Sequence, residues 1–151
     1  MEKIIHNVFL SLGSNLGDKI GSIDKAIQEI SLDVGVIEVV SSPFFSKPLG
    51  FISENDFVNS VIRISTDKSP LELLQSLKLI ERRMGRVLKS KENYSDRTID
   101  IDIIFYDQIS LNSEELIIPH PKWKERDFVY IPLNEITTKE ERLLFNSDFN
   151  Y

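Results

Sequence analysis

One short stretch, residues 98–103, limits how this chain can fold. It reads TIDIDI, so isoleucine occupies every second position and the positions between are polar. Side chains alternate across a β-strand, so a strand with this pattern has one apolar and one polar face. The isoleucines must meet a core, while the opposite face carries Thr98, Asp100 and Asp102. The stretch therefore predicts a sheet whose isoleucine face packs on helices and whose aspartate face does not.

Three further strands are expected, at residues 3–12, 36–45 and 57–65. Each segment is short and rich in apolar, β-branched or aromatic residues. Pro43 near the end of the second segment indicates an edge strand or a strand end. The segment containing LIIPHP looks extended, residues 123–131 form a short helix, and residues 137–151 carry no clear pattern.

Two helices are expected between these strands. Asp18 is a suitable N-cap for a helix that runs through about Leu32. The apolar face of this helix is predicted to hold Ile20, Ile23, Ile27 and Ile30. The sequence SPLE at 69–72 is a capping box that opens a second helix ending near Gly85. Its core face is predicted to hold Leu73, Leu77, Ile80 and Met84.

The resulting order is β-α-β-β-α-β, which predicts an α+β fold with a ferredoxin-like βαββαβ core. We expect a mainly antiparallel sheet with helices on one face and loops over the active-site face. The length of 151 residues suits one domain with one core, so residues 1–151 are expected to form a single domain.

Composition excludes several classes of protein. The formal net charge is −6, whereas non-specific nucleic-acid binders usually carry excess positive charge. The chain has no cysteine, which excludes disulfides and thiolate metal sites. No basic segment leads into a long apolar run, and the apolar runs are too short for a bilayer. We expect a cytoplasmic monomer with no membrane or nucleic-acid partner.

A local surplus of positive charge interrupts this acidic chain. Residues 78–97 hold three acids against seven basic residues, namely Lys78, Arg82, Arg83, Arg86, Lys89, Lys91 and Arg97. Such a cluster is either a solvated helix face or a binding site for a small anion. Arginine grips phosphate with two parallel hydrogen bonds, so Arg86 and Arg97 are the candidates for phosphate contacts.

The pair Asp100 and Asp102 has two possible interpretations, a cation site and a solvated strand face. Residues i and i+2 of a strand lie about 6.5–7 Å apart, so Asp100 and Asp102 repel unless solvent or a cation lies between them. Magnesium ions prefer a couple of carboxylates together with water and phosphate oxygens. A polar strand face washed by solvent is the alternative.

Phe57 and Asn59 share a face of the fourth predicted element, the strand at 57–65. An outward aromatic ring beside an amide can hold a flat polar heterocycle by stacking and hydrogen bonding. An ordinary core phenylalanine beside a turn-facing asparagine is equally consistent. The glycines of LGSNLGD mainly shape a turn, because the segment lacks the pattern of a P-loop.

Together these segments resemble the 6-hydroxymethyl-7,8-dihydropterin pyrophosphokinase family of folate biosynthesis. The resemblance covers residues 11 to 133, in the segments SLGSNLGD, SKPLGFISENDFVNSV, IERRMGR, DRTIDIDIIFYD and IPHPKWKERDFVYIPL. It implies transfer of a pyrophosphoryl group from ATP to the hydroxymethyl group of the pterin, with release of AMP.

The resemblance also implies roles for individual residues. Asp100 and Asp102 match a pair that holds two Mg²⁺ ions, and these two with Arg86 and Arg97 form the implied catalytic set. The implied ATP contacts are Arg86, Tyr94, Arg97, Ile103, His120 and Arg126. The implied pterin contacts are Ser46, Pro48, Leu49, Phe57, Asn59 and Phe128, with the two phenylalanines on either side of the ring. The N-terminal turn of the family is carried by Gly13, Ser14 and Asn15.

This chain departs from the family pattern around its arginine-rich loop. Ser95-Asp96 stands where the family often has Gly-Pro, and Tyr94 where it usually has tryptophan. Leu88 and Lys78 replace an arginine and a glutamine, and the loop 87–96 is about one residue longer. These differences bear on nucleotide contacts and not on the aspartate pair.

Two other functions fit the predicted fold. A non-catalytic ferredoxin-like module could bind a nucleotide or a metal, because fold alone does not determine function. Such a module has no need for an acidic pair, flanking arginines and two phenylalanines together. A nucleic-acid-binding domain needs exposed aromatic residues on a basic sheet, which Asp100 and Asp102 oppose.

Overall fold

The computed structural model describes residues 3–47, 56–85 and 98–146. In chain order the elements are β1 (His6–Ser14), α1 (Lys19–Asp33), β2 (Val36–Val40), β3 (Phe44–Ser46), β4 (Phe57–Thr66), α2 (Pro70–Arg83), β5 (Asp100–Tyr106), β6 (Leu111–Asn112), β7 (Ile117–Ile118), the 3₁₀ turn η1 (Trp123–Glu125), α3 (Asp127–Ile136) and α4 (Lys139–Asn146). None of the helices in these ranges is long and apolar enough to cross a membrane.

The main sheet is antiparallel and β1 lies at its centre. The strand order is β2-β4-β1-β5, and the short β3 also pairs with β4. A separate hairpin is formed by β6 and β7. The predicted mixture of helices and a mainly antiparallel sheet is confirmed. The predicted strand at 36–45 is two strands, because the chain leaves the ladder at 41–43, where Pro43 has no N–H to donate.

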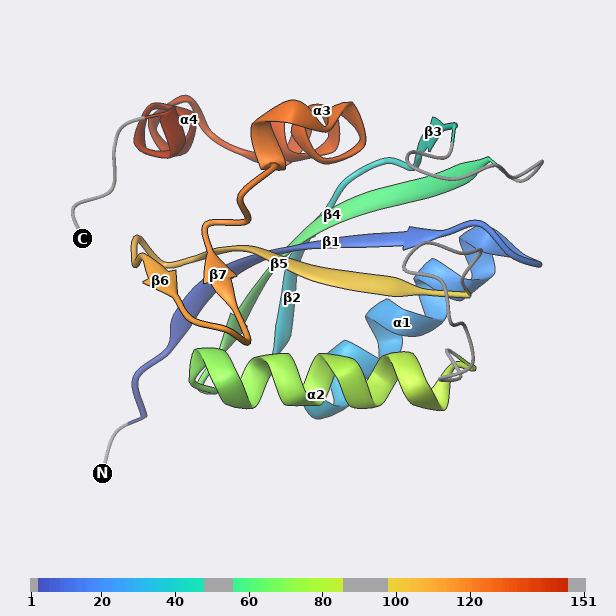
Figure 1. Cartoon of the computed structure of the whole chain (residues 1–151), viewed down its shortest axis with the longest axis horizontal. Coiled ribbons are helices and arrows are strands. Elements are labelled where there is room, and N and C mark those ends of the chain that lie inside the picture. The colour runs from blue at the N-terminus through green and yellow to red at the C-terminus, as the bar shows by residue number, and fades with distance from the viewer. Residues whose placement is uncertain (1–2, 48–55, 86–97, 147–151) are drawn as a thin grey trace.

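Helices α1 and α2 cover one face of this sheet (Figure 1). Both N-caps are as predicted: Asp18 accepts from Gly21 N–H, and Ser69 and Glu72 form a reciprocal capping box. This face holds the larger core, which the helices share with alternate residues of the strands, among them Leu10, Leu12, Ile62, Ile64, Ile99, Ile101 and Ile103. The predicted apolar face of α1 is wrong at one position. Ile20 is 45% exposed, and Ala26 is buried instead.

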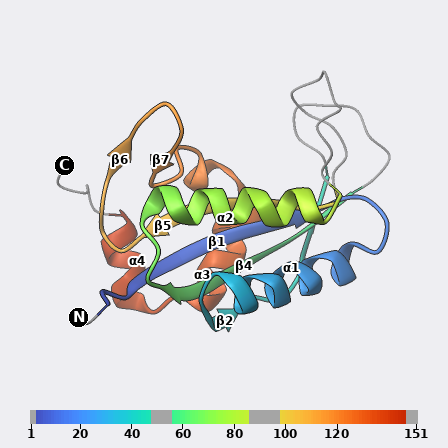
Figure 2. The same ribbon diagram turned by 90° about the horizontal axis from the view of Figure 1, so that it is seen from below.

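The opposite face of the sheet has a second core, beneath α3 and α4. The two views place these helices on the side of the sheet away from α1 and α2 (Figures 1 and 2). Phe145 of α4 stacks on Phe105 of β5, with ring centroids 4.0 Å apart, and Trp123 packs edge-on against the same ring. The prediction of loops over this face is therefore wrong where α3 and α4 cover it. The apolar residues of strands β1, β4 and β5 here needed a partner, and the C-terminal helices supply it.

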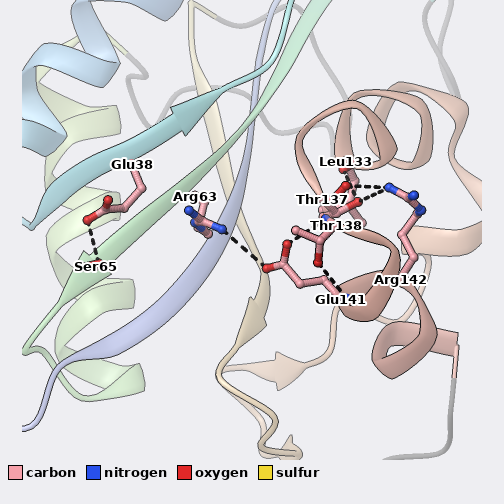
Figure 3. Close-up of polar contacts among 8 residues, drawn as sticks. All are labelled: Glu38, Arg63, Ser65, Leu133, Thr137, Thr138, Glu141 and Arg142. Atoms are coloured by element: carbon pink, nitrogen blue, oxygen red, sulfur yellow. Dashed lines mark hydrogen bonds and ion pairs between the residues drawn. The ribbon is translucent and has the colours of Figure 1, made fainter.

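Polar contacts hold α4 against α3 and the sheet (Figure 3). Thr138 and Glu141 form a reciprocal capping box that starts α4. Arg142 donates to carbonyl oxygens of Asn134 and Thr137 at the end of α3. Glu141 also forms an ion pair with Arg63 of β4, with 3.6 Å between Oε2 of Glu141 and Nη1 of Arg63. These contacts satisfy backbone groups that a helix end leaves open.

Candidate active site

The candidate site lies on the second face of the sheet, beyond the core beneath α3 and α4. Here three strands place residues directly opposite one another. Gly13 of β1 pairs with Asn59 of β4 on one side and with Asp100 of β5 on the other. Ser11 pairs with Asp102 in the next row. Directly paired residues point to the same face, so the amide and the two carboxylates share one surface.

The strand β5 has the two faces that its sequence predicts. Ile99, Ile101 and Ile103 are buried in the helix-side core, with exposures of 0%, 6% and 4%. Asp100 and Asp102 are half-buried on the opposite side. Because the side chain of Ile103 lies in the core, any nucleotide contact at this residue would use its backbone.

A bulge in β5 links the strand to His120. Phe9 pairs with Phe105 and Leu10 pairs with Ile103, so Ile104 is the extra residue between them. The backbone N–H of His120 donates to the Ile104 carbonyl oxygen at 3.0 Å. The bulge therefore brings the segment after β7 next to the aspartate strand.

The surroundings of His120 keep its ring neutral. Burial, and secondarily the positive charge of Arg126, lower the pKa of His120 to about 4, although Asp100 opposes the shift. The backbone N–H of Lys122 donates to Nδ1 at 3.1 Å. Since Nδ1 is an acceptor, the neutral ring carries its proton on Nε2. His120 can thus offer one neutral N–H to a ligand, and it lies within electrostatic reach of both Asp100 and Arg126.

Gly13 lets the side chain of Asn59 lie flat against the sheet. A Cβ at residue 13 would be 2.5 Å from Nδ2 of Asn59 and 3.8 Å from the Phe57 ring. Asn59 is only 5% exposed, and its Oδ1 finds no hydrogen-bond partner within the described residues. A buried acceptor without a partner is costly, so this oxygen is available to a donor on a ligand.

Ser46 of β3, which pairs with Phe57 of β4, presents a second polar atom on the sheet face that carries Asn59. Its Oγ is also buried, and the described part of the chain offers it no partner. Ser46 and Asn59 therefore leave two hydrogen-bonding atoms unsatisfied on neighbouring strands β3 and β4.

Arg126 and Phe128 lie at the start of α3. The guanidinium carbon of Arg126 is 5.6 Å from the centroid of the Phe128 ring, within cation–π range. Both side chains are half-buried, and Phe128 also packs against the second core. Arg126 is thus held by the ring and directed to the same region as His120.

Five of the predicted site residues fall outside the described residues, namely Pro48, Leu49, Arg86, Tyr94 and Arg97. The basic cluster is described only up to residue 85. Within it, Arg83 pairs with Asp33 at 2.8 Å and Glu29 at 3.4 Å, so this arginine joins α2 to α1.

The sequence reasoning missed Glu81 of α2. Glu81 is 7% exposed, and its Oε2 accepts from the backbone N–H of Ile101 at 2.7 Å. Because β5 is the last strand in the order β2-β4-β1-β5, the N–H of Ile101 points away from the sheet. Glu81 accepts this N–H, which lies between Asp100 and Asp102 in the sequence. Helical spacing was an available signal, because residue 81 follows Leu77 by one turn and shares its buried face.

No cluster of three or more histidine, aspartate or glutamate side chains suited to a metal ion occurs in residues 3–47, 56–85 and 98–146. The donors present are the two half-buried carboxylates of Asp100 and Asp102. Two hard oxygen groups on one surface fit Mg²⁺, which takes its other ligands from water and phosphate.

Residues 9–138 match the family model of 7,8-dihydro-6-hydroxymethylpterin-pyrophosphokinase, abbreviated HPPK. The chain belongs to the HPPK family. Two relatives named 2-amino-4-hydroxy-6-hydroxymethyldihydropteridine pyrophosphokinase come from Porphyromonas gingivalis and Haemophilus influenzae. The first is 38% identical over 85% of this chain and 89% of its own length. The second is 39% identical over 86% of this chain and 81% of its own length.

Longer proteins also contain a region similar to this HPPK chain. A folic acid synthesis protein of Pneumocystis carinii is 42% identical over 86% of the chain, which spans 17% of that protein. A crystal structure of HPPK-DHPS from Plasmodium falciparum superposes with a TM-score of 0.70 and 16% identity. The superposed region covers 96% of this chain and 44% of the Plasmodium falciparum chain. At 16% identity, the similarity supports the fold alone.

Proposed function

We propose that this protein transfers the terminal diphosphate of ATP to the hydroxymethyl group of 6-hydroxymethyl-7,8-dihydropterin. The products are AMP and the pterin diphosphate, in folate biosynthesis. Membership of the HPPK family and the names of the relatives support an ATP-dependent pyrophosphokinase. ATP is then a co-substrate.

The observation that carries this proposal is the row Asn59–Gly13–Asp100 across three strands. Neighbouring strands lie about 4.8 Å apart, so Asn59 and Asp100 are roughly 10 Å apart across the glycine. One side of the row has an unsatisfied amide oxygen suited to a heterocycle. The other side has carboxylates suited to a cation that binds phosphate. A substrate with a flat ring and a short arm ending in the acceptor oxygen fits between them.

For the pterin, Asn59 would receive a donor of the ring on Oδ1. Phe57 and Phe128 would stack on the two ring faces, and Ser46, Pro48 and Leu49 would line the edge. A site built to hydrogen-bond a polar ring rejects analogues that leave its buried groups unpaired. The buried oxygens of Asn59 and Ser46 would thus supply much of the selectivity.

For ATP, Arg86 and Arg97 would bind phosphate oxygens, and Tyr94, Ile103, His120 and Arg126 would complete the nucleotide site. His120 would donate from Nε2 without adding charge, while the arginines carry the positive charge. Asp100 and Asp102 would hold Mg²⁺, with two ions expected. Bound there, Mg²⁺ supplies charge neutralisation on the phosphates and lowers the pKa of the hydroxyl.

The reaction is an in-line displacement in which the pterin oxygen attacks the β-phosphorus of ATP and AMP leaves. The residues of this chain contribute by positioning the two substrates and by stabilising charge on the bridging oxygens. Asn59, Phe57 and Phe128 orient the hydroxymethyl arm. Exclusion of water from the closed site would limit hydrolysis of ATP, which competes with the transfer.

We also propose that the β2-β4-β1-β5 sheet with α1 and α2 is a ferredoxin-like core. The chain would act as a single domain and as a cytoplasmic monomer. The element order supports the ferredoxin-like core, and the absence of cysteine supports the cytoplasmic location.

The test mixes the protein with ATP, Mg²⁺ and 6-hydroxymethyl-7,8-dihydropterin and measures AMP by chromatography. We expect AMP to form only when the pterin is present. AMP formation without the pterin, or none with it, would refute the proposed reaction. Binding of ATP with no transfer would favour a non-catalytic binding module instead.

A further inference from the structure

The carboxylate of Glu135 in α3 accepts hydrogen bonds from both the backbone and the side chain of Ser42. Ser42 lies 93 residues away, in the connection between β2 and β3. The Ser42 hydroxyl donates to Oε1 of Glu135 at 2.6 Å. The backbone N–H of Ser42 lies 3.1 Å from Oε1 and 3.0 Å from Oε2. A carboxylate that accepts from two donors of one residue binds that residue strongly and in one orientation.

The neighbouring Ser41 fixes the same connection to the sheet. Its N–H donates to the Val61 carbonyl oxygen at 2.9 Å, and its hydroxyl accepts from Val61 N–H at 2.9 Å and contacts the Ser60 hydroxyl at 3.0 Å. Residues 41 and 42 thus form a joint: one residue is bound to β4 and the next to α3.

This joint connects the two elements that carry the walls of the proposed pterin site, since it binds β4 through Ser41 and α3 through Ser42. Directly after it, β3 pairs with β4 at Phe44–Asn59 and Ser46–Phe57, which makes one wall. Helix α3 carries Phe128, the other wall. Phe128 and Glu135 are seven residues apart, so they lie on the same face of α3, separated by about 10 Å along its axis.

We propose that Glu135 is a positioning residue that sets the distance between the Phe57 and Phe128 walls of the pterin site. The inference rests on the proposed function. Glu135 does not touch the substrate. It binds β3 to α3, so that Phe57, Asn59 and Ser46 keep their place relative to Phe128. Displacement of a binding wall by about 1 Å can reduce productive binding by up to about a hundredfold.

The test compares Glu135→Ala with Glu38→Ala. Glu38 is a matched control because it too accepts from a serine hydroxyl, Ser65 Oγ at 3.0 Å (Figure 3). Ser65 lies near the other end of β4 from Phe57. Calorimetry gives the Kd of each protein for 6-hydroxymethyl-7,8-dihydropterin and for a non-hydrolysable ATP analogue with Mg²⁺. Thermal unfolding gives the Tm.

For Glu135→Ala we expect the pterin Kd to rise about threefold to thirtyfold, the range expected for the loss of roughly one exposed hydrogen bond. The Kd for the ATP analogue should rise by a smaller factor, because Arg126 is the one proposed nucleotide contact that borders α3. Both Kd values of Glu38→Ala should remain those of the wild type. Ser42→Ala keeps the backbone contact, so its pterin Kd should rise by a smaller factor.

An unchanged pterin Kd in Glu135→Ala would overturn the inference, even if the Tm falls, because Glu135 would then serve stability alone. Equal rises in both Kd values would overturn it too. If Glu135→Ala does not fold, an unchanged pterin Kd in Ser42→Ala is the refuting result. Absence of pterin-dependent AMP formation by the wild-type protein would instead refute the proposed function, and the inference with it.

Discussion

The most direct test of the site geometry is the substitution Gly13→Ala. Gly13 lies between Asn59 and Asp100 in the sheet, and the added methyl group would be 2.5 Å from Nδ2 of Asn59. Ordinary contact begins at 3.4 Å, so the amide must withdraw by about 0.9 Å. Because Nδ2 is the end of a side chain, the amide can rotate away and the fold can survive.

We expect Gly13→Ala to weaken binding of the pterin. A displaced Asn59 can no longer align its amide with the pterin ring, and the added methyl group would lie 3.8 Å from the Phe57 ring. Because a buried amide is then left without its ligand partner, the pterin Kd is expected to rise by about 10- to 100-fold, or roughly 1.4 to 2.7 kcal/mol. Calorimetric titration with 6-hydroxymethyl-7,8-dihydropterin measures this directly, with the ATP analogue titrated in parallel.

Gly17→Ala is the control: Gly17 lies in the turn after β1, whereas Gly13, predicted to shape that turn, is a residue of the strand itself. A Cβ at residue 17 would have no atom within 4 Å among the described residues, but Gly17 has φ of 64°. That substitution is expected to lower stability by about 1 kcal/mol through backbone strain without changing the pterin Kd. If Gly13→Ala binds the pterin as tightly as Gly17→Ala does, the placement of the pterin over this row of residues is wrong.

Three further predictions concern the aspartate strand and its neighbours. Asp102→Ala should abolish nearly all Mg²⁺-dependent AMP formation while circular dichroism shows an intact fold; near-normal turnover would contradict the metal assignment. Glu81→Ala should leave the buried N–H of Ile101 without its acceptor. The free energy of unfolding, measured by urea denaturation, should fall by about 1–3 kcal/mol. An unchanged urea midpoint would refute the stabilising role of Glu81. The pKa of His120 is lowered to about 4 from 6.5, so the unfolded chain binds the extra proton between these pH values. Wild-type stability should therefore fall as pH drops from 6.5 towards 4, more steeply than in His120→Gln, and equal slopes would refute the buried neutral ring.

Much of the helix-side architecture could be predicted because its signals are local. The capping box of Ser69 and Glu72 links residues three apart, and the buried stripe of α2 follows the helical period. The face of each residue in β5 follows from alternation as far as Ile103. Beyond that point the bulge at Ile104 breaks the period, and no pattern in the sequence announced it. Ile20 was misplaced because the start of α1 extends past the core that its later turns meet.

The candidate site was only partly predictable. The spacing of Asp100 and Asp102, and of Phe57 and Asn59, indicates which side chains share a face of one strand. It does not indicate which strands are neighbours. Glu81 was overlooked because an acidic residue on a basic helix resembles a surface residue until its acceptor contact with β5 is known.

By itself, the sequence determined helices α1 and α2 and the two-faced character of the strand at 98–103, because helical and strand periodicities act over a few residues. The tertiary structure decided that Gly13 separates Asn59 from Asp100, since strand register depends on the packing of whole elements. It also decided that α3 and α4 cover part of the second face and that Glu135 meets Ser42 across 93 residues. Such contacts form only when distant segments dock, so no local pattern along the chain specifies them.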